Sequence, residues 1–256
     1  IATLLSGSSG RPIDASAHGV GQSSQSAIVA WREQVLTASD GTEYSYFGRR
    51  VALSGSTLVV GAGWADVAST EGTRGSAYVY ERDSGPPDDW REERKLGAPD
   101  ATPGDGFGWS VAIAADLIAV GATGRTAGGA EPTTARHAVY LFGRDQDGVG
   151  RWGLIKKLQG SDTLAGDQFG YSVSLDGDML WVGAPYATIS GNTAQGAAYI
   201  FAKDEGGLGQ WGQVKKSVAS DGSQYDRFGG SLSGSGYTVA VGAPLAYWGP
   251  VREGAA

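Results

Sequence analysis

Few side chains in this sequence could carry out chemistry, and their types and spacing do not favour an enzyme. There is no cysteine, and the only histidines are His18 and His137, so thiol catalysis, histidine catalysis and zinc binding have little material. We expect His137 to begin a strand and to have a turn or surface role. Paired carboxylates occur at Asp88-Asp89 and Glu92-Glu93, on a predicted hairpin and an outer strand, where solvated surface is their expected role.

Two short motifs could be mistaken for ligand sites. The segment Gly104–Gly108 contains G-x-G-x-G, but it opens a predicted strand and not a helix, so it lacks the context of a nucleotide site. The run Asp145-Gln146-Asp147-Gly148 has calcium-ligand residue types, but we interpret it as a polar turn between two strands. The sequence therefore predicts no catalytic residue, no metal site and no cofactor.

Composition excludes further classes of protein. The net charge is −7 and there is no basic run, so neither nucleic acid nor an anionic membrane is an expected partner. The longest apolar run, Val111–Val120, is interrupted by Asp116 and is too short for a transmembrane segment. The sequence starts with IATLL and lacks the features of a signal peptide, which favours a processed or truncated start.

One stretch with hairpin character occurs four times. In each copy a Phe-Gly pair leads through an alternating segment and a short turn to a Gly-Ala pair, and 43 glycines in 256 residues fit many tight turns. Each Phe lies 14 positions before its Gly. The pairs are Phe47 and Gly61, Phe107 and Gly121, Phe169 and Gly183, and Phe228 and Gly242. A fixed internal period decides the architecture.

Other residues repeat with the same period, which is about 60 residues. An Asp lies seven positions before each Phe, a second Asp lies two before it in three copies, and a Tyr lies 12 before each of three Trp residues. These residues are Asp40, Asp100, Asp162 and Asp221; Asp105, Asp167 and Asp226, with Ser45 in the first copy; Tyr78, Tyr140 and Tyr199; and Trp90, Trp152 and Trp211. Each unit then contains four strand candidates.

The prediction is an all-β fold, a β-propeller of four-stranded antiparallel blades. Residues 31–256 carry the blades, and the Ser-, Gly- and Ala-rich segment 1–30 matches the repeat poorly. We expect the Phe to wedge between blades and the following Gly to need a positive φ or a close approach. We expect the Asp seven residues earlier to cap a turn, and the Trp and Tyr to pack on the outer strands.

These residues resemble a known family. The segments FGYSVSLDGDMLWVGAP, GDQFG, WGLIKKLQGSD and GAAYIFAKD are similar to FG-GAP repeats, the units of the integrin α-subunit β-propeller, in their bacterial and protist form. The resemblance implies that the S-V-A segment is the innermost strand and that the protein is an extracellular or cell-surface adhesion or ligand-binding module. Integrin repeats often carry a calcium loop between the first two strands, but here that turn is shortened, as at Ser54-Gly55-Ser56. Calcium is therefore not an expected cofactor.

The family usually has seven blades, and this sequence shows four Phe-Gly units. Gly254-Ala255-Ala256 aligns with Gly196-Ala197-Ala198, which precedes a third strand, and Trp31–Leu36 matches a fourth strand with no unit before it. Two interpretations follow: the two ends complete one blade, or the sequence is a piece of a larger, seven-bladed propeller. We favour a piece.

Function is then expected on the loops that follow each Gly-Ala pair, because the strands repeat and these loops do not. The loops are 63–75, 123–136, 185–195 and 244–253, and their candidate binding residues are Trp64, Arg125, Tyr186, Tyr247 and Trp248. Aromatic residues and Arg are favoured at interface hot spots, which predicts a protein partner. The alternatives are a lectin-like propeller that binds glycan, a structural subunit of a larger assembly, and rings that only cover the blade ends.

Overall fold

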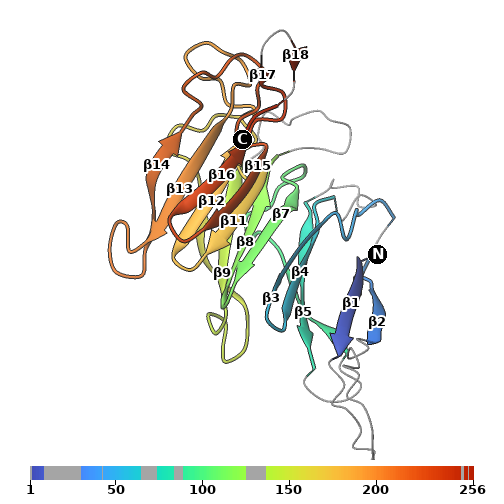
Figure 1. Ribbon diagram of the computed structural model, residues 1–256. Helices are drawn as coiled ribbons and strands as arrows, with labels where there is room; N and C mark the ends of the chain where they lie inside the picture. The colour runs from blue at the N-terminus through green and yellow to red at the C-terminus, as the bar shows by residue number, and fades with distance from the viewer. Residues whose placement is uncertain are drawn as a thin grey trace, which may run out of the picture. The chain divides into compact units, whose positions relative to one another are not determined.

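The computed structural model describes residues 2–8, 30–41, 43–64, 74–83, 89–124, 137–248, 251–252 and 254–256 (Figure 1). These residues form strands and turns, and none of them belongs to a helix, so no helix there could cross a membrane. The all-β prediction is confirmed for this part of the chain. The chain divides into two compact units, Ile1–Thr37 and Ala38–Ala256.

The smaller unit contains one pair of strands. Strand β1 (Ala2–Ser8) is antiparallel to β2 (Ala30–Leu36), with Ala2 opposite Leu36 and Ser8 opposite Ala30. The predicted fourth-strand match, Trp31–Leu36, coincides with β2. Part of the Ser-, Gly- and Ala-rich segment therefore forms a strand.

The larger unit contains the repeats. Three of them are four-stranded sheets in which each strand is antiparallel to its neighbours. The first repeat contains β3 (Arg50–Ser54), β4 (Thr57–Ala62), β5 (Ser76–Arg82) and β6 (Trp90–Leu96). The second contains β7 (Phe107–Ala114), β8 (Leu117–Ala122), β9 (Ala138–Gly143) and β10 (Gly153–Leu158). The third contains β11 (Ser172–Asp176), β12 (Met179–Ala184), β13 (Ala197–Lys203) and β14 (Trp211–Ser217).

The fourth repeat has only its first two strands as named elements, β15 (Ser231–Ser235) and β16 (Thr238–Gly242). A two-residue pair, β17 (Tyr247–Trp248) and β18 (Val251–Arg252), follows it. The first strands β3, β7, β11 and β15 are neighbours in space, as Figure 1 shows for the second to fourth repeats. The sheets are thus propeller-like blades whose first strands lie next to one another.

Apolar side chains fill the spaces between successive sheets. The second strands are buried on both faces, which is why β4 and β8 are nearly continuous apolar runs and not alternating ones. One core cluster joins the first and second repeats and includes Val59 and Phe107; a second joins the second and third repeats and includes Leu141 and Phe169. Phe107 and Phe169 are thus wedges between sheets, as predicted, whereas Phe47 and Phe228 are only half-buried.

Glycine main-chain atoms make the contact between neighbouring repeats. Gly108 has φ 92°, in the left-handed region that glycine adopts without strain. A Cβ on Gly61 of the first repeat would overlap the carbonyl oxygen of Gly108 in the second. The same overlap would occur between Gly183 and Gly229. Both expected reasons for glycine, a positive φ and a close approach, are therefore present.

The first repeated Asp has partners that the sequence analysis did not predict. In the first three repeats this Asp, for example Asp100, accepts hydrogen bonds from a tyrosine and a lysine. The second repeated Asp caps a turn: Asp105 accepts from the Thr102 amide at 2.7 Å and Asp167 from the Leu164 amide at 2.9 Å. These partners are three positions apart, a spacing typical of a side-chain turn cap.

Candidate functional site

The candidate site lies at one end of the repeats in the larger unit. Second strands end and third strands begin at this end, where the chain also enters each Phe-Gly pair. First strands end and second strands begin at the other end, and third strands end and fourth strands begin there as well. We call these the loop end and the turn end.

Three of the five candidate residues are not fully described by the structure. Arg125 lies outside the described residues. Tyr247 and Trp248 form β17, but their side chains are not among those the structure describes. Trp64 and Tyr186 are fully described, and both side chains are half-buried at the loop end.

Trp64 is part of a group of rings that joins the first and second repeats. Its ring centroid is 4.3 Å from that of Tyr46, in a T-shaped pair, and 6.1 Å from that of Trp109. The guanidinium of Arg49 lies 5.4 Å from the Trp64 ring and 4.4 Å from the Trp109 ring. Arg49 therefore makes cation–π contact with rings of two repeats.

The ring contacts continue into the third repeat and end at a cation of the fourth. The centroid of Trp109 is 5.6 Å from that of Tyr171, and the centroid of Tyr171 is 6.4 Å from that of Tyr186. The guanidinium of Arg227, from the fourth repeat, lies 4.7 Å from the Tyr186 ring. Two candidates far apart in sequence thus belong to one row. We define the aromatic row as Tyr46, Arg49, Trp64, Trp109, Tyr171, Tyr186 and Arg227.

The repeat explains why these side chains meet. Arg49, Trp109 and Tyr171 each lie two positions after the Phe of their repeat, where the chain enters the first strand. Trp64 and Tyr186 each lie three positions after the repeated Gly. Sequence analysis missed five of the seven residues because aligned positions hold different residue types. The signal was their fixed distance from the Phe-Gly pair.

Burial along the aromatic row is uneven. Trp109 is only 2% exposed, whereas Tyr46 is 46% exposed and Arg49 is also exposed. The indole nitrogen of Trp64 is buried, and no described group accepts a hydrogen bond from it. The row therefore combines rings that hold the repeats together with rings and a cation that reach solvent.

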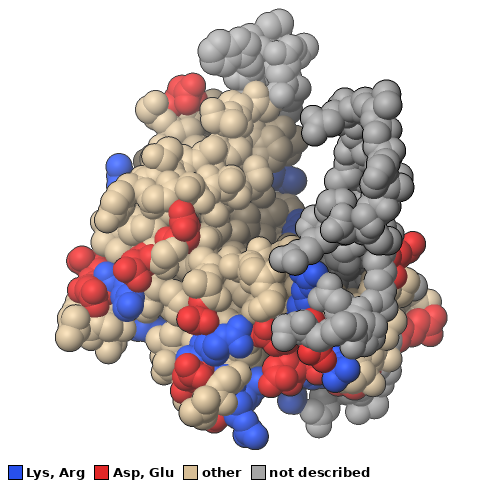
Figure 2. Space-filling model, turned by 60° about the horizontal axis from the view of Figure 1, so that its bottom comes forward, with Lys and Arg blue, Asp and Glu red and all other residues tan. Residues whose placement is uncertain are grey.

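The turn end differs in its chemistry. Figure 2 brings this end forward and shows charges of both signs gathered there. Arg144 pairs with Glu81 at 2.8 Å and with Asp116 at 3.0 Å, and Arg94 pairs with Asp147 at 2.6 Å. Asp147 belongs to the run with calcium-ligand residue types, and its neighbour Asp145 accepts from the Gly150 amide. This run is a turn with its carboxylates engaged, as the sequence interpretation predicts.

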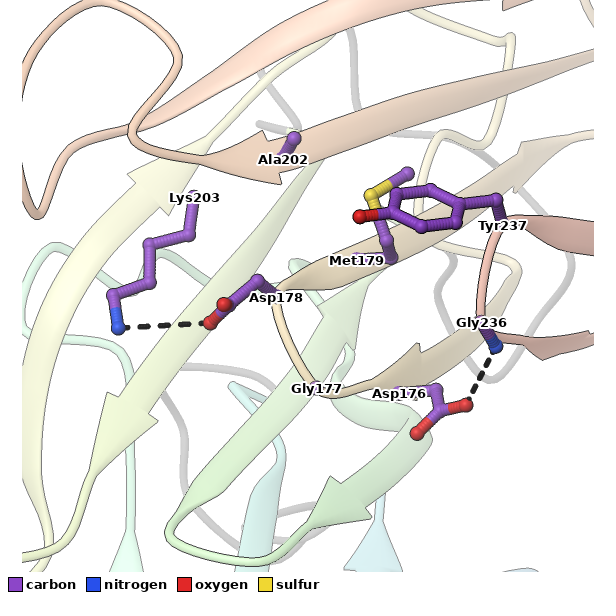
Figure 3. A pocket seen from close by; sticks show the side chains of 8 residues that line it. All are labelled: Asp176, Gly177, Asp178, Met179, Ala202, Lys203, Gly236 and Tyr237. Carbon is purple, nitrogen blue, oxygen red and sulfur yellow. Dashed lines mark hydrogen bonds and ion pairs between the residues drawn. The ribbon is translucent and has the colours of Figure 1, made fainter.

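A hollow of about 380 Å³ opens at the turn end between the third and fourth repeats (Figure 3). Two carboxylates line it, but Asp178 pairs with Lys203 at 3.5 Å, and Asp176 accepts from the Gly236 amide at 2.7 Å. Tyr237 lies at its rim, 91% exposed. Within the described ranges, no group of three or more His, Asp or Glu side chains is placed to hold a metal ion.

His137 departs from expectation, because it is buried and not on the surface. It is 5% exposed, and its Nε2 accepts from the Gly166 amide at 3.2 Å. The carboxyl of Asp167 lies in the same segment, and burial raises its pKa. His137 is thus part of the packing beside the turn that Asp167 caps.

The comparisons decide the family. The family model described as FG-GAP repeat matches residues 31–80, 90–142, 152–201 and 211–256, which is most of the chain. The chain belongs to the FG-GAP repeat family. Each match begins at a Trp-initiated strand and includes one segment from a Phe-Gly pair to a Gly-Ala pair, so the resemblance inferred from the sequence is confirmed.

The FG-GAP chain was also compared with curated proteins and with solved structures. A search of curated proteins gave no match. Among solved structures, the chain is similar to Sqt1 from Chaetomium thermophilum, with 12% sequence identity and a TM-score of 0.43. The similarity covers 79% of this chain and 43% of that one, so the FG-GAP chain spans less than half the length of Sqt1.

Proposed function

We propose that this FG-GAP chain is a non-catalytic binding module, extracellular or at the cell surface, that presents its loop end to a protein partner. The observation that carries the proposal is the aromatic row, which crosses the repeats at that end and exposes Tyr46 and Arg49. Aromatic rings give a large contact area at low entropy cost, and Arg adds directed hydrogen bonds. At the turn end, by contrast, Arg144 is paired with the carboxylates of Glu81 and Asp116.

The aromatic row supports a protein partner over a glycan. A lectin-like propeller with one sugar site per blade needs equivalent aromatics in each repeat. The position of Trp64 and Tyr186 holds Gly124 in the second repeat and Leu245 in the fourth. The row is continuous across repeats and not repeated within them, which suits one extended partner.

We also propose that the propeller-like sheets are blades around a common axis. Support comes from the first strands β3, β7, β11 and β15, which are neighbours in space although about 60 residues separate them. An experimental structure tests this proposal. The four first strands must converge on one axis, and strands stacked in a straight line would contradict it.

The binding proposal is tested with peptides selected by phage display against the immobilised chain. Arg49→Ala is the main variant, because Arg49 is exposed and its removal leaves the rings in place. It should weaken the selected peptides by about tenfold or more, and Trp64→Ala should cost about 2 kcal/mol of binding.

Tyr237→Ala is the matched control, since Tyr237 is an exposed ring at the opposite end. It should leave affinity unchanged. Melting temperature is measured for every variant. If loop-end variants melt earlier but bind equally well, the rings only pack and the proposal is wrong. Binding to a glycan array in place of peptides would also overturn it.

A further inference from the structure

Two positions in every repeat have a left-handed backbone conformation. They lie three positions and one position before the Phe of each Phe-Gly pair, at the loop end. In the second repeat both positions hold glycine, Gly104 with φ 91° and Gly106 with φ 64°. Glycine adopts this conformation without strain, because it has no Cβ. Glycine is therefore the relaxed choice at both positions.

The first and fourth repeats hold large side chains at these two positions. In the first repeat Tyr44 has φ 64° and Tyr46 has φ 54°, and in the fourth repeat Tyr225 has φ 69° and Arg227 has φ 60°. Tyrosine and arginine are uncommon with a positive φ, because their Cβ then crowds a main-chain carbonyl oxygen. These four residues therefore strain the backbone where a glycine would not.

The main-chain contacts of Tyr225 and Arg227 explain their backbone conformation but not their side chains. The two amides donate to the carbonyl oxygens of Thr193 and Ala194 in the third repeat, at 2.9 and 3.1 Å. Any residue except proline has such an amide, so a glycine at either position would keep these hydrogen bonds. The joint between the third and fourth repeats thus requires the left-handed conformation and neither a tyrosine nor an arginine.

The tyrosines at the first of these positions gain little from burial. Tyr44 is 65% exposed and Tyr225 is 45% exposed. Gln168, at the second position of the third repeat, also has a positive φ, 54°, but it is only 4% exposed and belongs to the packing. Burial of apolar surface can offset backbone strain. For Tyr44 and Tyr225 a large part of the ring stays in solvent, so packing does not account for them.

The strained positions adjoin the aromatic row at both of its ends. Tyr46 forms a T-shaped pair with Trp64, at 4.3 Å between ring centroids, and the guanidinium of Arg227 lies 4.7 Å from the Tyr186 ring. The Nε of Arg227 is buried, and no described group accepts a hydrogen bond from it, which is a second unfavourable feature of this residue. Tyr44 and Tyr225 each lie two positions before these end members of the row.

We propose, on the basis that the loop end is the binding surface, that Tyr44 and Tyr225 are binding residues which extend the aromatic row at its two ends. Residues that strain the backbone are concentrated at functional sites, where the side chain has a role that offsets its effect on stability. The partner that fits is one extended polypeptide segment that contacts the first and the fourth repeat together. The two rings pack on its apolar side chains, and their hydroxyl groups donate to its main-chain carbonyl oxygens.

Substitution by asparagine separates binding from packing, because Asn tolerates the left-handed conformation and does not add the flexibility of glycine. Tyr44→Asn and Tyr225→Asn should leave the melting temperature of the full chain unchanged or raise it. Each should weaken the peptides selected by phage display about tenfold. Ala115→Asn is the matched control, since Ala115 is exposed at the turn end with φ 47°. It should relieve strain in the same way and leave the affinity unchanged.

Melting and binding together decide the outcome. A clear fall in the melting temperature of both tyrosine variants would show that the rings hold the fold together, and the proposal would be wrong. If Arg49→Ala weakens the peptides but the folded Tyr44→Asn and Tyr225→Asn variants bind as the unaltered chain does, the loop end binds without these tyrosines and only their assignment is wrong. If Arg49→Ala and both tyrosine variants all bind normally, the loop end is not the binding surface, and the proposed function itself is overturned.

Discussion

The third and fourth repeats contain the same segment, from a Phe-Gly pair to a Gly-Ala pair, yet only the third repeat buries it. Phe169 is fully buried between its own third strand and the second repeat, whereas Phe228 is half-buried. Trp181 in β12 is 1% exposed, and the residue at its position in β16, Ala240, is exposed. The two inner hairpins have the same strand pairing, so the difference is not one of local backbone structure.

The difference comes from what lies around each hairpin. In the third repeat, β13 and β14 cover the outer edge and the fourth repeat covers one face, where Gly234 lies against the Trp181 ring. In the fourth repeat, the described residues place two strands and one paired alanine. The stability of a repeat array is the sum of interactions within repeats and between neighbouring repeats. Comparing the third repeat with the fourth therefore shows what the outer strands and the following repeat add to the same inner hairpin.

The largest expected difference concerns the repeated phenylalanine. Phe169→Ala should destabilise the chain by about 3–5 kcal/mol, because the ring leaves a cavity among Tyr199, Phe201 and the second repeat. Phe228→Ala should cost only about 1 kcal/mol, because its ring is half-exposed already. Urea unfolding of both variants gives the free energies. Equal losses would show that the outer strands do not bury this ring.

A second pair of variants compares two equivalent glycines, Gly183 in the third repeat and Gly242 in the fourth. A Cβ on Gly183 meets the main-chain carbonyl of Gly229, which cannot move without shifting the fourth repeat. A Cβ on the equivalent Gly242 meets only the Ser231 hydroxyl, which can rotate away. Gly183→Ala should therefore cost about 1–3 kcal/mol in urea unfolding, and Gly242→Ala less than about 1 kcal/mol. A larger loss at Gly242 would contradict the main-chain joint.

The smallest expected difference concerns the equivalent carboxylates of Asp162 in the third repeat and Asp221 in the fourth. The hydrogen bond from Lys216, together with that from Tyr199, holds the pKa of Asp162 below its usual value, and burial raises the pKa of Tyr199. A lowered carboxyl pKa adds stability that is present above about pH 4 and is lost as the pH falls through the folded-state pKa. Asp162→Asn should therefore lower the melting temperature at pH 7 and change it less at pH 3.

Asp221→Asn is the control for this pair, because Asp221 has no partner among the described residues. Its melting temperature should equal that of the unaltered chain at both pH values. Tyr199→Phe provides a second check at pH 7 and should cost about 1 kcal/mol. An Asp162→Asn variant that melts like the Asp221→Asn variant would show that the hydrogen bonds of Tyr199 and Lys216 to Asp162 contribute nothing to stability.

Much of the fold could be predicted from the sequence because it depends on spacing. The interval from Phe107 to Gly121 fixes a hairpin, and the period of about 60 residues fixes the number of strands in a repeat. The role of Asp100 could not be predicted, because its partners Tyr140 and Lys157 follow it by 40 and 57 positions. An Asp before a turn is locally indistinguishable from a turn cap.

The candidate site was predicted less completely. Trp64 and Tyr186 stand out in divergent loops, and both lie in the aromatic row. Arg49, Trp109 and Tyr171 were hidden because they sit at one aligned position that changes from Arg to Trp to Tyr. The sequence marks positions that stay the same from repeat to repeat. This row arises where repeats differ, and only the packing of one repeat on the next shows that these residues touch.

The joint made by Gly61 and Gly108 has a consequence for how such a protein changes over generations. Main-chain atoms are the same in every repeat, so a duplicated or recombined repeat inherits a fitting joint as long as it keeps these two glycines. Lengthening an array then requires no matched substitutions on the two sides of the new boundary. The loops of each copy are free to diverge from the moment of duplication, and new binding surfaces can accumulate on an inherited frame.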